Sequence, residues 1–365
     1  MTSFKIAVLP GDYIGPEVIV EALRVLEVVG RRFGHAFQFD EAPLGGAAWD
    51  RYGEHLPQST IATCEQADAI LKGPVGGPTQ ETGHPKWQGV ETNALLPLRK
   101  HFDLVLNLRP IVVPEALIDL SPLRPERVRG TDLLMLRELT GGIYFGASGE
   151  RQVEGPHERL EREVYDTEVY REHEIERAAR AGFRLAAGRR GKVTLVAKSN
   201  VMKSGVFWRE VVERIAQEFP GVTLGYMHVD NATMQLIINP AQFDVIVTSN
   251  LFGDILSDEA AALLGSLGMG PSASLNEKGF GLYEPIHGSA PDIAGQGKAN
   301  PIATILSAAM MLRLSFNLPE AATAVEQAVD RVLAEGARTP DIATRGQPVV
   351  TTRELGRRVA AYVEG

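Results

Sequence analysis

The chain has 365 residues, of which 44% are hydrophobic and 23% charged, and its formal net charge is −9. This composition is ordinary for a globular protein, and the length predicts about two domains. The acidic balance argues against non-specific nucleic-acid binding, which needs a basic surface. A single cysteine, Cys64, excludes an intramolecular disulfide and favours a reducing, cytoplasmic setting.

The N-terminal stretch shows no signal-peptide pattern, and no uncharged run reaches the ~20 residues that a bilayer span needs. No membrane partner is therefore expected. Residues 5–9 predict a buried strand that ends at the turn Pro10-Gly11-Asp12, and a helix begins near Gly15. The glycines after this strand do not have the G-x-G-x-x-G spacing of a dinucleotide fingerprint. The loop is expected either to touch a ligand with its backbone or to be a plain tight turn.

Further strands are expected at 37–43, 69–71 and 104–108, and a helix is expected at 93–100. The glycine- and proline-rich run 73–78 follows the strand 69–71 directly. Ligands in α/β proteins collect beyond such strand ends. This run is therefore expected to form a rigid loop at the ligand-binding edge of a sheet.

Three arginines, Arg99, Arg109 and Arg137, each stand where an apolar element ends. The guanidinium fork suits carboxylates, so three such positions suggest a substrate with more than one carboxylate. The alternative is that these are surface or domain-interface arginines.

The glycine pair after Arg137 lies between two β-type runs and predicts a hairpin or a crossover. Tyr144, just beyond it, is either a core aromatic or a proton donor whose hydroxyl lies in a cleft. The charged segment 150–166 predicts a flexible loop or an arm that reaches a partner subunit.

Lys198 directly follows the predicted strand 192–197. Burial would lower the pKa of this lysine and allow it to act as a general base, whereas a snorkelling lysine is the alternative. Asp230 directly follows the next predicted strand, 223–229. It is interpreted either as a helix N-cap or as a metal carboxylate.

Asp254 and Asp258 follow the apolar strand 243–248 in a helical segment. Their i, i+4 spacing places both carboxylates on one helix face, where like charges repel unless a cation lies between them. Oxygen ligands suit Mg²⁺ or Mn²⁺. The alternative is a solvated acidic face.

The segment 284–300 is a turn-rich loop of small residues, which allow the backbone to approach a ligand closely. Asp292 is expected to bind ribose hydroxyls, the role that an acid plays in NAD-selective sites. Helices are expected at 301–315, 319–335 and 351–362.

Together these segments resemble the β-decarboxylating dehydrogenases, the family of the isocitrate and isopropylmalate dehydrogenases. The resemblance runs from Ile6 to the C-terminal helices. It is carried by the blocks LPGDYIGPEV, GPVGGP, LRK, NLRP, RELTGGIYFG, KSNV, VDNATMQL, FGDILSDEAA and EPIHGSAPDIAGQGKANP. One departure is Tyr13, which stands where the family usually has glycine.

The resemblance implies two α/β domains that share a large mixed central sheet, which differs from the Rossmann fold. The first domain, residues 1–104 plus 265–365, would bind NAD. The second, residues 105–264, would carry the metal and substrate residues and a dimerisation arm at about 150–166. The active protein would be a homodimer that takes Lys198 and Asp230 from the other subunit.

The same resemblance assigns roles to individual residues. Tyr144 and Lys198 would transfer protons, and Asp230, Asp254 and Asp258 would hold Mg²⁺ or Mn²⁺; a monovalent cation such as K⁺ is a further candidate. The substrate would contact Arg99, Arg109, Arg137, Asp230 and the apolar side chains Leu95, Leu96 and Val201. NAD would contact Ile14, Glu284, His287, Gly288, Ser289, Ala290, Pro291, Asp292, Ile293 and Asn300.

The implied reaction is NAD-dependent oxidative decarboxylation of a dicarboxylate, a 3-substituted malate. The expected substrate is 3-isopropylmalate, which gives 4-methyl-2-oxopentanoate and CO₂ in leucine biosynthesis. An alternative is a paralogue of secondary metabolism that acts on another 3-substituted malate, homoisocitrate or tartrate. A catalytically silent subunit is disfavoured because every proton-transfer and metal residue is present.

Overall fold

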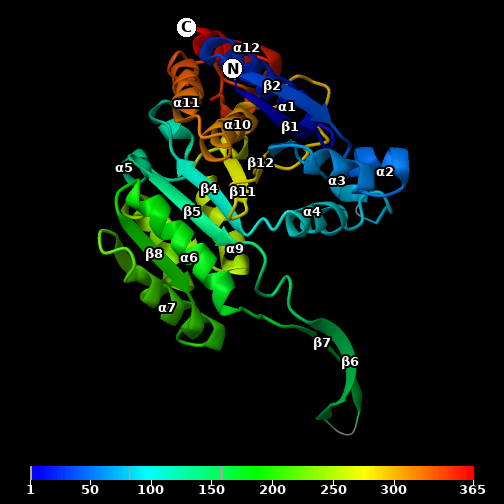
Figure 1. Cartoon of the computed structure of the whole chain (residues 1–365), viewed down its shortest axis with the longest axis vertical. Coiled ribbons are helices and arrows are strands. Elements are labelled where there is room, and N and C mark those ends of the chain that lie inside the picture. The colour runs from blue at the N-terminus through cyan, green and yellow to red at the C-terminus, as the bar shows by residue number, and fades with distance from the viewer. Residues whose placement is uncertain (1, 82, 157–158) are drawn as a thin grey trace. The chain divides into compact units, whose positions relative to one another are not determined.

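The computed structural model describes residues 2–81, 83–156 and 159–365, and the chain divides into two compact units (Figure 1). Unit 1 comprises residues 1–104, 108–132 and 260–365, and unit 2 comprises residues 105–107 and 133–259. No helix among the described residues combines the length and apolarity needed to cross a bilayer.

Residues 108–132 belong to unit 1, whereas the sequence predicts that they open the second domain. The reason is that this segment packs on the C-terminal helices. Buried Arg338 donates from Nη2 to the carbonyl oxygen of Ala116 at 2.9 Å. Such a contact joins residues more than two hundred positions apart, so no local pattern signals it.

The strands are ordered β2-β1-β3-β12-β11-β4-β5-β10-β8-β9 in one ten-stranded sheet. It is a mixed sheet: β11 and β12 pair antiparallel, whereas β1 pairs parallel with both β2 and β3. This confirms the predicted fold class. The bounds are β1 Ser3–Leu9, β2 Ala36–Glu41, β3 Ala69–Lys72, β4 Leu106–Val112, β5 Asp132–Glu138, β8 Lys192–Ala197, β9 Thr223–His228, β10 Val245–Thr248, β11 Pro271–Leu275 and β12 Gly281–Pro285.

The helices follow the apolar periodicity of the sequence. In α1 (Gly15–Phe33), Val18, Ala22 and Val25 are fully buried, and the helix packs against α12. In unit 2, α6 and α7 pack against β8. The remaining bounds are α2 Gly46–Tyr52, α3 Gln58–Glu65, α4 Leu96–His101, α5 Pro125–Val128, α6 Glu172–Ala187, α7 Lys203–Ala216, α8 Val229–Ile238, α9 Asn250–Ala262, α10 Ile302–Leu314, α11 Pro319–Ala334 and α12 Thr352–Glu364.

Three local predictions need correction. The helix expected at 93–100 begins as a π-helical turn, Glu91–Leu95, before α4. Of the two alternatives for the glycine pair after Arg137, a hairpin or a crossover, the hairpin is wrong, because the pair lies in a turn and the strands on either side belong to different sheets. For the charged segment 150–166 the sequence predicts a flexible loop or an arm, and it is a regular hairpin rather than a flexible loop, with β6 (Ser148–Glu154) paired to β7 (Leu160–Asp166). His157 and Glu158 lie outside the described residues.

Two glycine-rich loops of unit 1 lie in direct backbone contact. A Cβ on Gly11 would lie 2.1 Å from the carbonyl oxygen of Pro74, and a Cβ on Gly73 would lie 2.1 Å from that of Pro10. The amide of Asp12 donates to the Pro74 carbonyl at 2.8 Å. These glycines therefore let the loop after β1 and the loop after β3 pack on each other.

The side chain of Asp12 ties these loops to a third one. Its carboxylate is buried and accepts backbone N–H bonds from Gly46, Ala47 and Gly76 at 3.0, 2.9 and 2.9 Å. Burial raises the pKa of Asp12, although the three N–H donors act in the opposite direction. Asp12 is thus the polar centre on which three loops of unit 1 converge.

Replacement of Asp12 by alanine is expected to lower the free energy of unfolding by about 3 kcal/mol, because three backbone N–H donors, that of Gly46 buried, lose a charged acceptor. Urea unfolding monitored by circular dichroism measures this loss. Glu54→Ala, which removes an exposed acid of the same unit, is the matched control and is expected to change stability by less than about 0.5 kcal/mol. Equal effects of the two substitutions would contradict the assignment.

Candidate functional site

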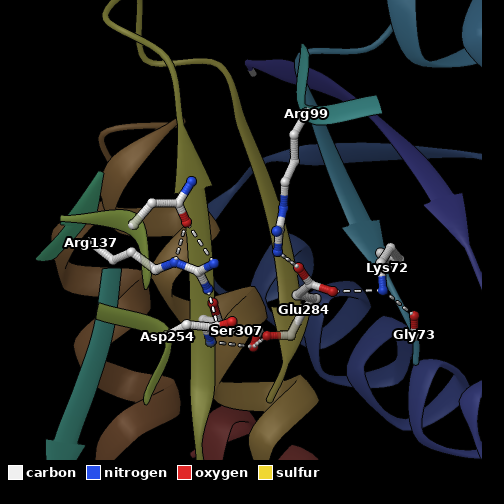
Figure 2. A network of polar contacts seen from close by, with 9 residues as sticks. Lys72, Gly73, Arg99, Arg137, Asp254, Glu284 and Ser307 are labelled. Carbon is white, nitrogen blue, oxygen red and sulfur yellow. Dashed lines mark hydrogen bonds and ion pairs between the residues drawn. The ribbon is translucent and has the colours of Figure 1, made fainter. Parts of the chain in front are cut away.

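Arg137 is the centre of a polar cluster in unit 2. It lies in β5, next to β10, and its side chain is buried. Its Nε and Nη2 donate to Oδ1 of Asn250 at 2.9 and 2.7 Å, and its Nη1 forms an ion pair with Oδ1 of Asp254 (Figure 2). Both partners lie on α9, so strand and helix together hold the guanidinium in one orientation.

Tyr144 joins this cluster through the same carboxylate. Its hydroxyl donates to Oδ2 of Asp254 at 2.9 Å, and the residue is 42% exposed. Burial of the phenol and the bond to Asp254 raise the pKa of Tyr144, so its hydroxyl stays protonated at neutral pH. A half-exposed, protonated phenol fits the proton-donor interpretation rather than that of a core aromatic.

Glu138 shapes the turn that leads to Tyr144. Its buried carboxylate accepts from the amides of Thr140 and Gly141 at 2.7 and 2.8 Å. The ring of Tyr170 covers Gly141, where a Cβ would lie 2.7 Å from the ring. The glycine pair is therefore needed so that Tyr170 can pack closely on the turn. From the sequence alone, a glycine pair required for packing looks the same as one required for a hairpin.

Asp254 and Asp258 both lie on α9, as the i, i+4 spacing predicts. The charges of both aspartates act on the Tyr144 hydroxyl. Within the described part of a single chain, no three His, Cys, Asp or Glu side chains gather in a way that would hold a metal ion. The two carboxylates are the hard oxygen ligands that Mg²⁺ and Mn²⁺ prefer, so their chemistry fits such an ion. The described residues of one chain do not add a third carboxylate to them.

Lys198 and Asp230 form an ion pair in unit 2, with Nζ to Oδ1 at 2.7 Å. The lysine side chain keeps 26% exposure, so of the two alternatives given by the sequence the deeply buried lysine is not found. The reason is that Lys198 lies just after the end of β8 and pairs with Asp230, whose side chain is itself exposed. Asp230 is also not an N-cap, since it lies inside the first turn of α8 after His228. The lysine lowers the pKa of the Asp230 carboxyl, which is well exposed.

A second cluster lies in unit 1 around Glu284, at the end of β12 (Figure 2). Its Oε2 accepts from Lys72 Nζ at 2.6 Å, and its Oε1 lies 3.4 Å from Nη2 of Arg99. Burial alone would raise the pKa of Glu284, but the charges of Lys72, Arg99 and Arg109 outweigh it and hold that pKa below its usual value. Sequence reasoning missed Lys72, although a lysine that closes a buried strand is a visible signal.

Arg99 carries an unpartnered donor in this cluster. The residue is buried, and its Nε makes no hydrogen bond to any of the described residues. A buried N–H without an acceptor costs free energy unless a ligand supplies one. The arginine fork therefore fits a carboxylate ligand, in agreement with the sequence-based interpretation.

The loop after β12 is held to the start of α1. The amide of Ile14 donates to the carbonyl of Ser289 at 3.1 Å, and Ile293 packs with Ile14 in a small apolar cluster. His287 Nε2 is buried without a partner among the described residues, and burial lowers the pKa of His287 so that its ring is neutral at pH 7. This ring nitrogen therefore leaves one hydrogen-bonding position open to a ligand.

Other predicted cofactor residues differ in accessibility. Asp292 and Gly288 are exposed. Asn300 is buried and already engaged, since its Oδ1 accepts from the amide of Ile302 at 3.0 Å and its Nδ2 donates to Asp341 at 3.1 Å. Its direct contact with NAD stays a prediction, and the structure shows it tying the loop to the first turn of α10.

The predicted apolar pocket residues have unequal surroundings. Leu95 packs against the core cluster of unit 1, and Leu96 is half-buried. Val201, in unit 2, is 74% exposed. Their roles therefore remain predictions for each residue separately.

Comparison with known proteins gives a consistent result. The family model described as "Isocitrate/isopropylmalate dehydrogenase" matches residues 5–359. A 3-isopropylmalate dehydrogenase of Mannheimia succiniciproducens is 56% identical, with 99% of each chain covered. One from Geobacillus kaustophilus is 54% identical, covering 100% of this chain and 96% of that protein.

Solved structures agree with this similarity. An isocitrate dehydrogenase from Methylococcus capsulatus matches with a TM-score of 0.84 and 34% identity, covering 99% of this chain and 100% of that one. A β-decarboxylating dehydrogenase from Thermococcus kodakarensis matches with a TM-score of 0.79 and 33% identity, at 99% and 96% coverage.

The Arg137 cluster depends on Gly253, because a Cβ there would lie 2.6 Å from Cβ and Cγ of Arg137. Helix propensity alone predicts that Gly253→Ala stabilises α9 by about 1 kcal/mol. We expect the opposite sign, a loss of about 1–2 kcal/mol in a thermal or urea unfolding measurement, because the arginine must move. Gly221→Ala, in open space, is the control and is expected to stay within about 0.5 kcal/mol. A stabilised Gly253→Ala variant would contradict the packing argument.

Proposed function

The chain belongs to the isocitrate/isopropylmalate dehydrogenase family, and on that premise we propose that it catalyses the oxidative decarboxylation of 3-isopropylmalate to 4-methyl-2-oxopentanoate and CO₂, a step of leucine biosynthesis. The observation that carries the proposal is full-length similarity, at 54–56% identity, to proteins named for this activity. The polar clusters in the two units are consistent with it, because they contain the cations, the carboxylates and the proton donor that the reaction requires.

Binding of the substrate falls to the arginines. Arg99 in unit 1 presents a buried Nε that has no hydrogen-bond partner among the described residues. Arg137 in unit 2 is held by Asn250 and Asp254. We assign these two, with Arg109, to the carboxylates of the malate. Each bidentate Arg–carboxylate pair fixes an orientation as well as supplying charge, and this restricts the substrate to one reactive pose.

Two proton transfers frame the chemistry. When the C2 hydroxyl is oxidised, its proton passes to the Lys198–Asp230 pair, whose groups are 2.7 Å apart. After CO₂ leaves, the C3 carbon of the resulting enol must receive a proton. We assign this step to the Tyr144 hydroxyl, which is protonated at neutral pH and is oriented by Asp254.

Two bound groups complete the reaction. NAD⁺, held by Ile14 and the loop with His287, Asp292 and Ile293, would accept the hydride from C2. Mg²⁺ or Mn²⁺, held by Asp254 and Asp258 with Asp230, would stabilise developing negative charge as a Lewis acid. The family relationship supports both groups. The His287 Nε2, which has no hydrogen-bond partner among the residues that the structure describes, and the oxygen donors on α9 are compatible with them.

We further propose a homodimer in which Asp230 and Lys198 serve the active site of the partner subunit. A set of three metal carboxylates requires a second chain, because the described residues of one chain do not assemble it. The β6–β7 hairpin supplies a suitable contact: Leu160 and Val164 on it are 76% and 62% exposed.

The location of the enzyme is proposed to be the cytoplasm. Its single cysteine, Cys64, is a buried free thiol, which is in keeping with a reducing compartment.

A substrate panel tests the proposed reaction. With NAD⁺ and Mg²⁺, kcat/KM for 3-isopropylmalate is expected to exceed that for tartrate or homoisocitrate by about tenfold or more, since an apolar substituent is worth ~1–3 kcal/mol of selection. NADH formation and CO₂ release are measured for each compound. A higher kcat/KM for a polar 3-substituted malate would replace isopropylmalate as the substrate.

Asp254→Asn tests the metal and proton-transfer assignment. Loss of this carboxylate is expected to lower kcat by about 10³-fold, because it removes a metal ligand and the acceptor that orients Tyr144. NAD binding, measured by fluorescence quenching, is expected to change less than about threefold, since the proposed cofactor residues lie in unit 1. Glu210→Gln, at an exposed acid of unit 2, is the control. Near-normal turnover of Asp254→Asn in Mg²⁺ would remove Asp254 from the site.

A further inference from the structure

Lys72 is a charged residue in a place where strands normally carry apolar side chains. It is the last residue of β3, and its side chain is 2% exposed. Its Nζ donates to Oε2 of Glu284 at 2.6 Å and to the carbonyl oxygen of Gly73 at 2.9 Å (Figure 2). A buried ammonium is costly unless it is paired and hydrogen-bonded, so its position calls for an explanation.

The two cations around Glu284 are held unequally. Lys72 makes a short contact to one carboxylate oxygen, whereas Arg99 lies 3.4 Å from the other. Within the described part of the chain, the buried Nε of Arg99 has no hydrogen-bond partner. A carboxylate that met Arg99 alone would favour the bidentate fork geometry. The short bond to Lys72 therefore removes the strongest competitor for the Arg99 guanidinium.

We propose that Lys72 is a positioning residue that neutralises Glu284 and thereby keeps Arg99 available for a carboxylate of the substrate. This role rests on the proposed function, because it assumes a dicarboxylate bound by Arg99. Lys72 acts through Glu284 and does not itself contact the substrate. The net charge of the three side chains is one positive unit, which attracts an anion, whereas without Lys72 it would be zero.

Two other roles for Lys72 make different predictions. If it were only a structural member of the core, its loss would lower stability without a selective effect on substrate binding. If its ammonium contacted the substrate, its effect on binding would persist when Glu284 is neutral. Kinetic constants of Lys72 and Glu284 variants distinguish these cases, because KM does not depend on the fraction of folded enzyme.

The experiment compares the full-length wild type with Lys72→Met, Glu284→Gln and the double variant, using 3-isopropylmalate and NAD⁺. Lys72→Met is expected to raise KM for the dicarboxylate about tenfold or more, the equivalent of one charge-assisted hydrogen bond, because Glu284 then captures Arg99. KM for NAD⁺ is expected to change much less. Lys100→Met, which removes an exposed lysine next to Arg99 on α4, is the matched control and is expected to leave both constants unchanged.

The double variant is the decisive measurement. If Lys72 acts through Glu284, the double variant has the same KM for the dicarboxylate as Glu284→Gln alone, within about threefold. A KM that stays as high as in Lys72→Met would mean that Lys72 contacts the substrate, and an unchanged KM in Lys72→Met would mean a purely structural role; either result overturns the proposal. Should Lys72→Met not fold, the comparison of Glu284→Gln with the double variant still distinguishes a role through Glu284 from direct contact with the substrate.

Failure of the proposed reaction is detected separately. Wild-type turnover with 3-isopropylmalate reports on that reaction, whereas the ratio of variant to wild-type KM reports on Lys72. If the substrate panel identifies a different dicarboxylate, the same four proteins are compared with that compound.

Discussion

A charge removed from water must find a partner, and both polar clusters are solutions to that constraint. In unit 2 the buried Arg137 is matched by Asp254 and by the amide oxygen of Asn250. In unit 1 the buried Glu284 is matched by Lys72 and Arg99. In unit 2 the Tyr144 hydroxyl donates to the same Asp254 carboxylate and stays half-exposed, and in unit 1 the Arg99 Nε has no hydrogen-bond partner among the described residues. Functional groups are therefore held rigid by pairing without being fully satisfied by it.

Close backbone packing makes these pairings possible. Gly253 leaves room for the Arg137 stem, and Gly11 and Gly73 let two loops touch so that Asp12 can gather three amide donors. Tyr13, next to Asp12, adopts a positive φ of 52° that glycine would accept without strain, and its ring lies 5.6 Å from that of Trp87. Backbone strain of this kind persists where the surroundings over-determine the conformation.

Several features could be predicted from local pattern. Strand and helix positions followed from apolar periodicity, as for β1 and α1, and the i, i+4 spacing placed Asp254 and Asp258 on one helix. Others could not. The glycine pair at Gly141 has the same local sequence pattern as a hairpin, although it forms a turn. Residues 108–132 belong to unit 1, where Arg338 contacts them, and no local stretch of sequence contains both. The outward pairing of Lys198 with Asp230 likewise involves residues 32 positions apart.

The sequence by itself determined the family, the α/β class and the reaction type, because residue type and spacing carry that information. Only the tertiary structure decided which charges meet. Lys72, Arg99 and Glu284 come from β3, α4 and β12, and nothing in their local sequence shows that one carboxylate lies between two cations. The physical reason is that burial and pairing energies depend on distance in space, and the fold sets that distance through contacts remote in the chain.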